Sequence, residues 1–115
     1  VPYYIKLNFK MTTYFFVAAS EKFLTVEEPL EEILKERERN YKENNKEKDF
    51  WILKNPSFLQ ISQFVDLNAK IPKPAAAVIS TDKKFITFLK LRLEFVAVGE
   101  FECPNAEITD PFKVE

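Results

Sequence analysis

The chain has 115 residues and a net charge of −1, and it contains twelve phenylalanines but no histidine, one cysteine and one glycine. This composition argues against most catalytic, metal-binding and phosphate-binding sites, because those sites depend on histidine, paired cysteines or several glycines. The lack of a basic excess argues against nucleic-acid binding. We therefore expect no enzyme activity, no metal and no cofactor, and a protein that acts by contact with another protein.

The N-terminal part begins with a separate short stretch. Residues 1–10 lack the cleavage site of a signal peptide, and we interpret them as an upstream extension or a remnant of cloning, with Met11 as the native start. Residues 12–19 are aromatic and β-branched, which predicts a buried strand. No apolar run approaches the roughly 18 residues that a membrane span needs. We expect residues 11–115 to form one domain.

A helix is predicted next, because side chains recur at helical spacing on one face from Leu30 through Arg37 to Tyr41. Two starts are compatible with the sequence. Either Thr25 is the N-cap, at capping-box distance from Glu28, or Glu28 itself is the N-cap.

A strand, a helix and another strand follow in the middle of the chain. Residues 49–54 predict a second strand, and residues 57–70 predict a helix with its apolar side chains on one side. Pro72 and Pro74 would end this helix, because proline lacks the backbone donor that a helix interior requires. Residues 75–80 predict a third strand, whose small side chains would let a helix pack closely.

The last predicted helix starts near Lys83, after N-cap candidates at positions 80–82. We expect it to extend to about Val98, because Gly99 stands where a left-handed C-cap is favoured. The alternation of residues 91–95 is also compatible with a strand.

The C-terminal part is expected to hold a short fourth strand at residues 100–103, followed by a tail. The predicted elements alternate between strands and helices within one domain. This alternation by itself favours parallel pairing of the strands.

Few side chains offer reactive chemistry. Carboxylates are the abundant candidates, and four of them lie near the start of the first helix: Glu27, Glu28, Glu31 and Glu32. Two of them could support hydrolysis only if burial raised the pKa of one carboxyl group, and a charge-paired helix favours a solvated surface instead. Cys103 has no histidine to activate it, and we interpret it as a partly buried apolar residue in a reducing compartment.

Asp49, Phe50 and Trp51 form a more informative group. Adjacent strand residues point to opposite faces, so one large ring packs on the core and the other needs a cover. Both rings belong to the core if helices cover both sides of the sheet. If one ring is exposed, an aromatic beside a carboxylate is typical of an interface anchor.

Arg92 lies in an otherwise apolar stretch. A guanidinium in such a place extends to solvent, pairs with a carboxylate or meets a partner protein. Pairing with Asp49 or Glu94 would give it a purely structural role. Contact with a partner would give it a functional one.

Four segments carry a resemblance to a known family. Their sequences are MTTYFFVAASEKFLTVEEPLEEIL, KDFWILKNPSFL, PKPAAAVIST and KKFITFLKLRLEFVAVGEFE. The chain resembles the low-chlorophyll-accumulation A family, small cyanobacterial and plastid proteins long labelled as a conserved plastid open reading frame. The match runs in register from Met11 to about Pro111.

The resemblance implies a non-enzymatic accessory factor of the aerobic oxidative cyclase of chlorophyll biosynthesis, which converts magnesium-protoporphyrin IX monomethyl ester to protochlorophyllide. The partner would be the membrane-associated di-iron catalytic subunit. The protein would lie in the cyanobacterial cytoplasm or plastid stroma and reach the thylakoid membrane only through this partner. A tetrapyrrole carrier for the cyclase substrate or product is the alternative function, and a two-carboxylate hydrolase is a third.

The resemblance also implies an α+β fold, with helices covering an antiparallel sheet of about four strands. The family's Asp-Phe pair and helix arginine correspond without a gap to Asp49, Phe50 and Arg92. These three residues are therefore expected to bind the partner, and we expect them to form one surface patch.

Overall fold

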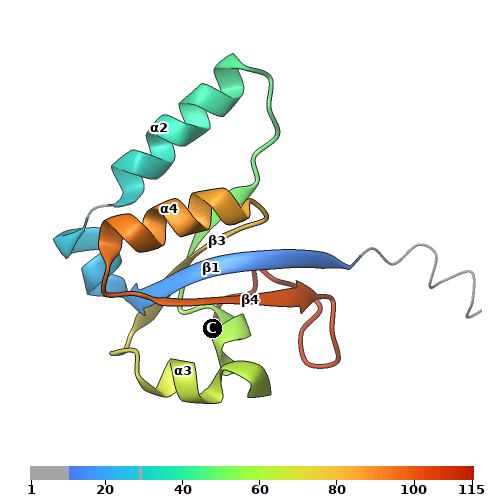
Figure 1. Cartoon of the computed structure of the whole chain (residues 1–115). Helices are drawn as coiled ribbons and strands as arrows, with labels where there is room; N and C mark the ends of the chain where they lie inside the picture. The colour runs from blue at the N-terminus through green and yellow to red at the C-terminus, as the bar shows by residue number, and fades with distance from the viewer. Residues whose placement is uncertain (1–10, 29) are drawn as a thin grey trace, which may run out of the picture.

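A four-stranded antiparallel sheet forms the middle layer of the protein, which confirms the expected fold class (Figure 1). The computed structural model describes residues 11–28 and 30–115, so our interpretation of residues 1–10 lies outside the described residues. The strand order is β2-β3-β1-β4, and the bounds are Thr12–Ser20 for β1, Phe50–Lys54 for β2, Ala75–Ser80 for β3 and Ala97–Cys103 for β4. Parallel pairing, which strand–helix alternation favours, is therefore wrong.

The upper face of the sheet carries the two longer helices (Figure 1). The helix α4 (Lys83–Leu93) lies along β1 and β3, whereas α2 (Leu30–Glu43) rises away from the sheet. A π-helical turn, η1 (Phe23–Glu27), connects β1 to this side. Thr25 lies inside this turn and its hydroxyl donates to the carbonyl of Glu21 at 2.7 Å, so Thr25 does not cap α2.

The lower face carries shorter elements, and three of them replace the predicted helix at residues 57–70. They are the 3-10 turns η2 (Ser57–Gln60) and η3 (Ser62–Phe64) and the helix α3 (Val65–Ala69). One continuous helix is wrong here because Ile61 has an extended backbone, with φ −70° and ψ 156°. This break lets Phe58 and Phe64 both reach the sheet, where they pack on Phe16.

The end of α4 also differs from the prediction. The helix ends at Leu93 rather than near Val98, and Gly99 lies within β4, opposite Phe16. A Cβ at Gly99 would lie 2.7 Å from Cζ of Phe16, so the glycine permits close packing and caps no helix.

The residues after β4 pack on the lower face instead of forming a free tail. Ile108 is 7% exposed and belongs to the aromatic core of this face. Val114 forms a bridge with Pro56, which follows β2. The C-terminal segment therefore helps to cover the lower side of the sheet.

A candidate protein-interaction groove between α2 and α4

An open groove separates α2 from α4. It has a volume of about 770 Å³ and is open to solvent. Its sides carry charged and apolar side chains in turn: Glu32, Ile33 and Glu36 from α2, and Lys84, Phe85 and Phe88 from α4. We call this surface the α2–α4 groove.

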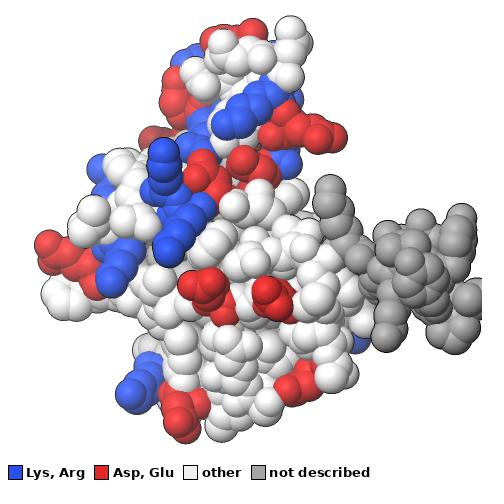
Figure 2. All heavy atoms as spheres, turned by 45° about the vertical axis from the view of Figure 1, so that its right-hand side comes forward, with Lys and Arg blue, Asp and Glu red and all other residues white. Residues whose placement is uncertain are grey.

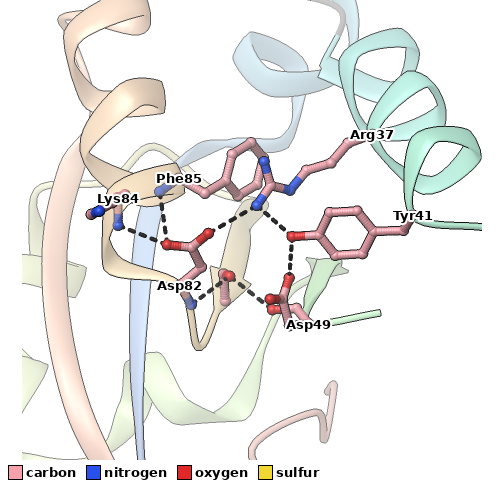
Figure 3. Close-up of polar contacts among 7 residues, drawn as sticks. Arg37, Tyr41, Asp49, Asp82, Lys84 and Phe85 are labelled. Atoms are coloured by element: carbon pink, nitrogen blue, oxygen red, sulfur yellow. Dashed lines mark hydrogen bonds and ion pairs between the residues drawn. The ribbon is translucent and has the colours of Figure 1, made fainter. Parts of the chain in front are cut away.

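A polar network at one end of the groove holds α2 to the rest of the protein (Figure 3). Arg37 Nη2 donates to the hydroxyl of Tyr41 at 2.6 Å and to Oδ2 of Asp82 at 3.0 Å. The Tyr41 hydroxyl in turn donates to Oδ1 of Asp49 at 3.0 Å. The network therefore joins α2, the start of α4 and the residue before β2.

Aromatic rings surround the cation of this network. The Arg37 guanidinium lies 3.9 Å from the ring centroid of Phe85, 4.9 Å from that of Tyr41 and 5.4 Å from that of Phe50. Such cation–π contacts add stabilisation, more so when the cation is partly desolvated. The Arg37 Nε–H is buried without a hydrogen-bond partner among the described residues, so this clamp is incompletely satisfied.

The Asp82 carboxylate that pairs with Arg37 also caps the start of α4. Oδ1 of Asp82 accepts from the backbone N–H groups of Lys84 and Phe85, as an N-cap does. Ser80 supports this turn, because its hydroxyl donates to the Asp49 carbonyl at 2.7 Å and accepts from the Asp82 N–H at 2.9 Å. The prediction of an N-cap at positions 80–82 is confirmed.

Exposed apolar side chains continue along the outer side of α4. Phe88 is 51% exposed, Leu91 73% and Phe95 81%. Phe95 follows a γ-turn, in which its N–H donates to the Leu93 carbonyl at 2.6 Å and Glu94 has φ 61° and ψ −57°. A non-glycine residue in this conformation is strained, so the backbone holds Phe95 outward at an energetic cost.

The three residues expected to form one surface patch do not form one, because Phe50 is buried and Arg92 lies away from Asp49. Phe50 is 1% exposed and packs between Tyr41 and Phe85 in the upper core, so its ring is not at the surface. The expectation of one surface patch is therefore wrong, because Phe50 points to the face of the sheet that α2 and α4 cover. Asp49 is half-buried in the polar network.

Arg92 is exposed, and no ion pair described for residues 11–28 and 30–115 includes it. It lies about 15 Å along α4 from Asp82, at about 1.5 Å rise per residue. The pairing with Asp49 or Glu94 that a structural role required is not formed. Arg92 follows Phe88 by one helical turn, so it extends the α4 side of the α2–α4 groove.

Sequence reasoning missed the central part of this site. Arg37 appeared only as one position on a helical face, and Asp82 only as a cap. A signal was present, because an arginine on the apolar face of a helix, one turn before Tyr41, requires a polar partner. Phe88 and Leu91 gave no such signal, since their exposure depends on where α2 leaves the sheet.

The surroundings of the other candidate residues do not favour reactive chemistry. Cys103 is 3% exposed, and burial, with the charge of Asp110, raises the pKa of its thiol, which keeps it protonated and unreactive. Within residues 11–28 and 30–115, no three or more His, Cys, Asp or Glu side chains gather as metal ligands would. No helix in this part of the chain is long and apolar enough to cross a membrane.

An antiparallel sheet with helices on both faces and an open groove between two of them defines a small α+β protein with a candidate interaction surface. The chain belongs to the Ycf54 family, whose model matches residues 12–103. It is 51% identical over 106 residues to a Ycf54-like protein of Synechocystis sp., a match that covers 92% of this chain and 79% of that protein.

Plastid and structural relatives agree with this assignment. A chloroplastic YCF54 protein of Arabidopsis thaliana is 38% identical over 97 residues, which cover 84% of this chain and 45% of that protein. The X-ray structure of a Nostoc sp. PCC 7120 protein is 54% identical with a TM-score of 0.89, covering 92% of this chain and 98% of that one. The Ycf54 structure from Synechocystis sp. PCC6803 is 48% identical with a TM-score of 0.87, covering 91% and 98%.

Proposed function

We propose that the protein is a non-enzymatic accessory or assembly factor of the aerobic magnesium-protoporphyrin IX monomethyl ester oxidative cyclase in chlorophyll biosynthesis. It acts by binding the membrane-associated di-iron catalytic subunit. It works in the cyanobacterial cytoplasm or plastid stroma and reaches the thylakoid membrane through this partner. Membership of a cyanobacterial and plastid family supports the setting, and the resemblance described above suggests the partner.

One observation carries the contact mechanism, namely the exposed apolar surface of the α2–α4 groove and of α4 beyond it. Phe88 and Leu91 are large apolar side chains that are exposed next to each other on α4, and such a gathered apolar surface is typical of an interaction site. Aromatic residues of this kind are enriched among the anchors of protein interfaces. Arg92 lies among them, so it suits direct contact, whereas Asp49 and Phe50 support α2 from beneath.

Binding to the catalytic subunit tests this assignment directly. The double variant Phe88→Ser/Leu91→Ser should weaken binding of the purified, detergent-solubilised subunit by about tenfold or more, as loss of interface anchors does. The matched control is Val65→Ser, because Val65 is 58% exposed on the opposite face. Equal binding by both variants and the wild type would contradict a role for this surface.

A cellular measurement separates contact from catalysis. A partner that binds the assembled state stabilises it by about 2.7 kcal/mol at a hundredfold excess over Kd. Loss of the protein should therefore lower the amount of catalytic subunit, measured by immunoblot, and let magnesium-protoporphyrin IX monomethyl ester accumulate. Unchanged subunit abundance with lost turnover would argue for a direct role in the reaction.

The tetrapyrrole carrier remains the alternative, because the volume of the groove lies within the range of small-molecule sites, roughly 300–1,000 Å³. Such sites usually enclose most of their ligand, whereas this groove is open to solvent, which supports the protein partner. Titration with magnesium-protoporphyrin IX monomethyl ester distinguishes the two. The carrier predicts a saturable absorbance shift at one ligand per chain, and the accessory factor predicts none.

A further inference from the structure

Apart from Arg37 and Asp82, which pair with each other at one end, the two sides of the α2–α4 groove carry opposite charges. Glu32 and Glu36 lie one helical turn apart on the α2 side. Lys84 lies on the α4 side, and Arg92 extends that side two turns further on. On the face that Figure 2 shows, charges of both signs gather on the upper part of the molecule, whereas charged groups are fewer and scattered on the lower part.

The acidic side remains available to a partner. Glu36 pairs with Arg39 on α2, but both side chains are 67% exposed. An ion pair so exposed contributes little and exchanges readily with another cation. Glu32 is exposed and takes part in none of the ion pairs described for residues 11–28 and 30–115.

The space between the two charged sides is apolar. Ile33 lines the groove together with Phe85 and Phe88, and the exposed Leu91 continues the apolar surface along α4. An occupant that covers this surface must itself be apolar on one side. It must also avoid burying backbone groups that have no hydrogen-bond partner.

A helical occupant meets both requirements. The backbone groups of α2 and α4 bond within their own helices and offer no partners to an extended segment. A helix satisfies its own backbone and needs only an apolar face, with anchors at i, i+3, i+4 and i+7. A third helix in this groove would also complete the layer that α2 leaves open where it rises from the sheet (Figure 1).

We infer that the α2–α4 groove binds an amphipathic helix of the partner protein. Basic residues line the edge of that helix facing Glu32 and Glu36, and acidic residues line the edge facing Lys84 and Arg92. The opposite charges fix how the helix is rotated about its axis, as edge charges do in coiled coils. This inference rests on the proposed function, since it takes the bound helix to belong to the catalytic subunit.

An anionic membrane surface fits the groove less well. Lys84 and Arg92 would favour it, together with the exposed rings of α4. However, the same approach would press Glu32 and Glu36 against lipid headgroups of the same charge. The acidic side of the groove therefore favours a protein partner of mixed charge.

Charge reversal on each side tests the inference, with the purified, detergent-solubilised catalytic subunit of the cyclase as the probe. Glu32→Lys/Glu36→Lys should weaken binding by about tenfold or more, because like charges then face each other. Glu31→Lys/Glu43→Lys is the matched control, since it makes the same change in net charge on exposed α2 positions outside the groove. Lys84→Glu/Arg92→Glu should weaken binding comparably.

Overlapping peptides from the catalytic subunit test the helical form. The peptide that binds should gain helicity by circular dichroism in the presence of the wild-type protein, and it should bind less to the charge-reversal variants. All variants are first compared with the wild type by thermal unfolding.

The outcomes separate the two proposals. If the wild-type protein does not bind the subunit, the proposed function fails and this inference with it. If the wild type binds but Glu32→Lys/Glu36→Lys binds equally well, the inference alone is overturned. Flotation with anionic vesicles supplies a further check. Vesicle binding lost in Lys84→Glu/Arg92→Glu, with subunit binding unchanged, would also overturn it.

Discussion

The two faces of the sheet are covered by different means. On the lower face, the Phe16 ring lies 4.8 Å from the Phe58 centroid and 5.0 Å from the Phe64 centroid, and Phe101 stacks on Phe58 at 4.8 Å. Aromatic pairs at such distances contribute beyond the area that they bury. Aromatic packing closes this face, and polar contacts lie at its rim.

The upper face combines packing with a polar clamp. α4 lies flat on the sheet through Phe85, Ile86 and Leu89, which are all buried. The bonds of Arg37 and Tyr41 hold the second half of α2, and Leu30 and Leu34 pack its first half into the upper core. The space between α2 and α4 is the α2–α4 groove. An open groove beside a partly held helix gives a partner a place to bind, whereas the lower face serves as its support.

Truncation of the aromatic cluster should have the largest effect on stability. Phe16 is fully buried, so Phe16→Ala should lower the free energy of unfolding by about 3–5 kcal/mol through lost burial and a cavity. Phe88→Ala is the matched change on the upper face, and it should cost under about 1 kcal/mol because that ring is half exposed. Urea unfolding of both variants measures the difference. Equal losses would contradict the contrast between the faces.

Gly99→Ala tests how tightly the lower face is packed. The new Cβ would meet the Phe16 ring at 2.7 Å, so we expect a loss of about 1–3 kcal/mol from overpacking. Combining it with Phe16→Leu makes room for the methyl group, so the two losses should be less than additive. Strictly additive losses in urea unfolding would show that Phe16 is not the obstacle.

Three of the four strands were the most predictable elements, whereas β4 (Ala97–Cys103) starts three residues before the predicted strand at residues 100–103. Residues 75–80 form β3 as predicted, and residues 12–19 and 49–54 match β1 and β2 within one residue, because short apolar runs bounded by turn residues have few alternatives. Antiparallel pairing could not be derived from the residues, since strand–helix alternation favours the opposite, and it came from the resemblance.

The helix predicted for residues 57–70 failed because the core needs three of its side chains at once. Phe58, Ile61 and Phe64 are all buried in the lower core, and the extended backbone at Ile61 divides the segment into two short turns that allow this. The aromatic cluster requires all three to face the sheet. Tertiary packing therefore set the local backbone here.

The candidate site was predicted only in part. Asp49 does lie at the edge of the site, and Arg92 is exposed, but the residues that build the clamp come from positions far apart in the sequence. Arg37 and Asp82 are brought together by the way α2 crosses the start of α4. No local pattern specifies that crossing, so the groove appeared only in three dimensions.

Tyr41→Phe should loosen the upper face without affecting the lower one. It removes the hydroxyl that accepts from Arg37 and donates to Asp49, at a cost of about 1 kcal/mol. Amide hydrogen exchange in α2 should become faster than the loss of global stability explains. Amides of β1 should change only by as much as the free energy of global unfolding changes. Uniform acceleration across the protein would instead mean that α2 unfolds only together with the sheet.

The smallest expected effect concerns the polar rim of the lower face, where the C-terminal segment is tied to η3. The hydroxyl of Ser62 donates to Oε1 of Glu107 and its N–H donates to Oε2 at 2.8 Å. These hydrogen bonds favour the carboxylate and lower the pKa of Glu107 below its usual value of 4.5.

A carboxyl group whose pKa is lower in the folded state contributes stability above its unfolded pKa and loses it as the pH falls through the folded value. Glu107→Gln should therefore lower the denaturant midpoint slightly at pH 7, and the difference from the wild type should shrink as the pH falls below about 4. Glu102→Gln, at an exposed position of β4, controls for the loss of a surface charge. A difference at Glu107 that persists unchanged at pH 3 would show that the contact does not depend on the carboxylate.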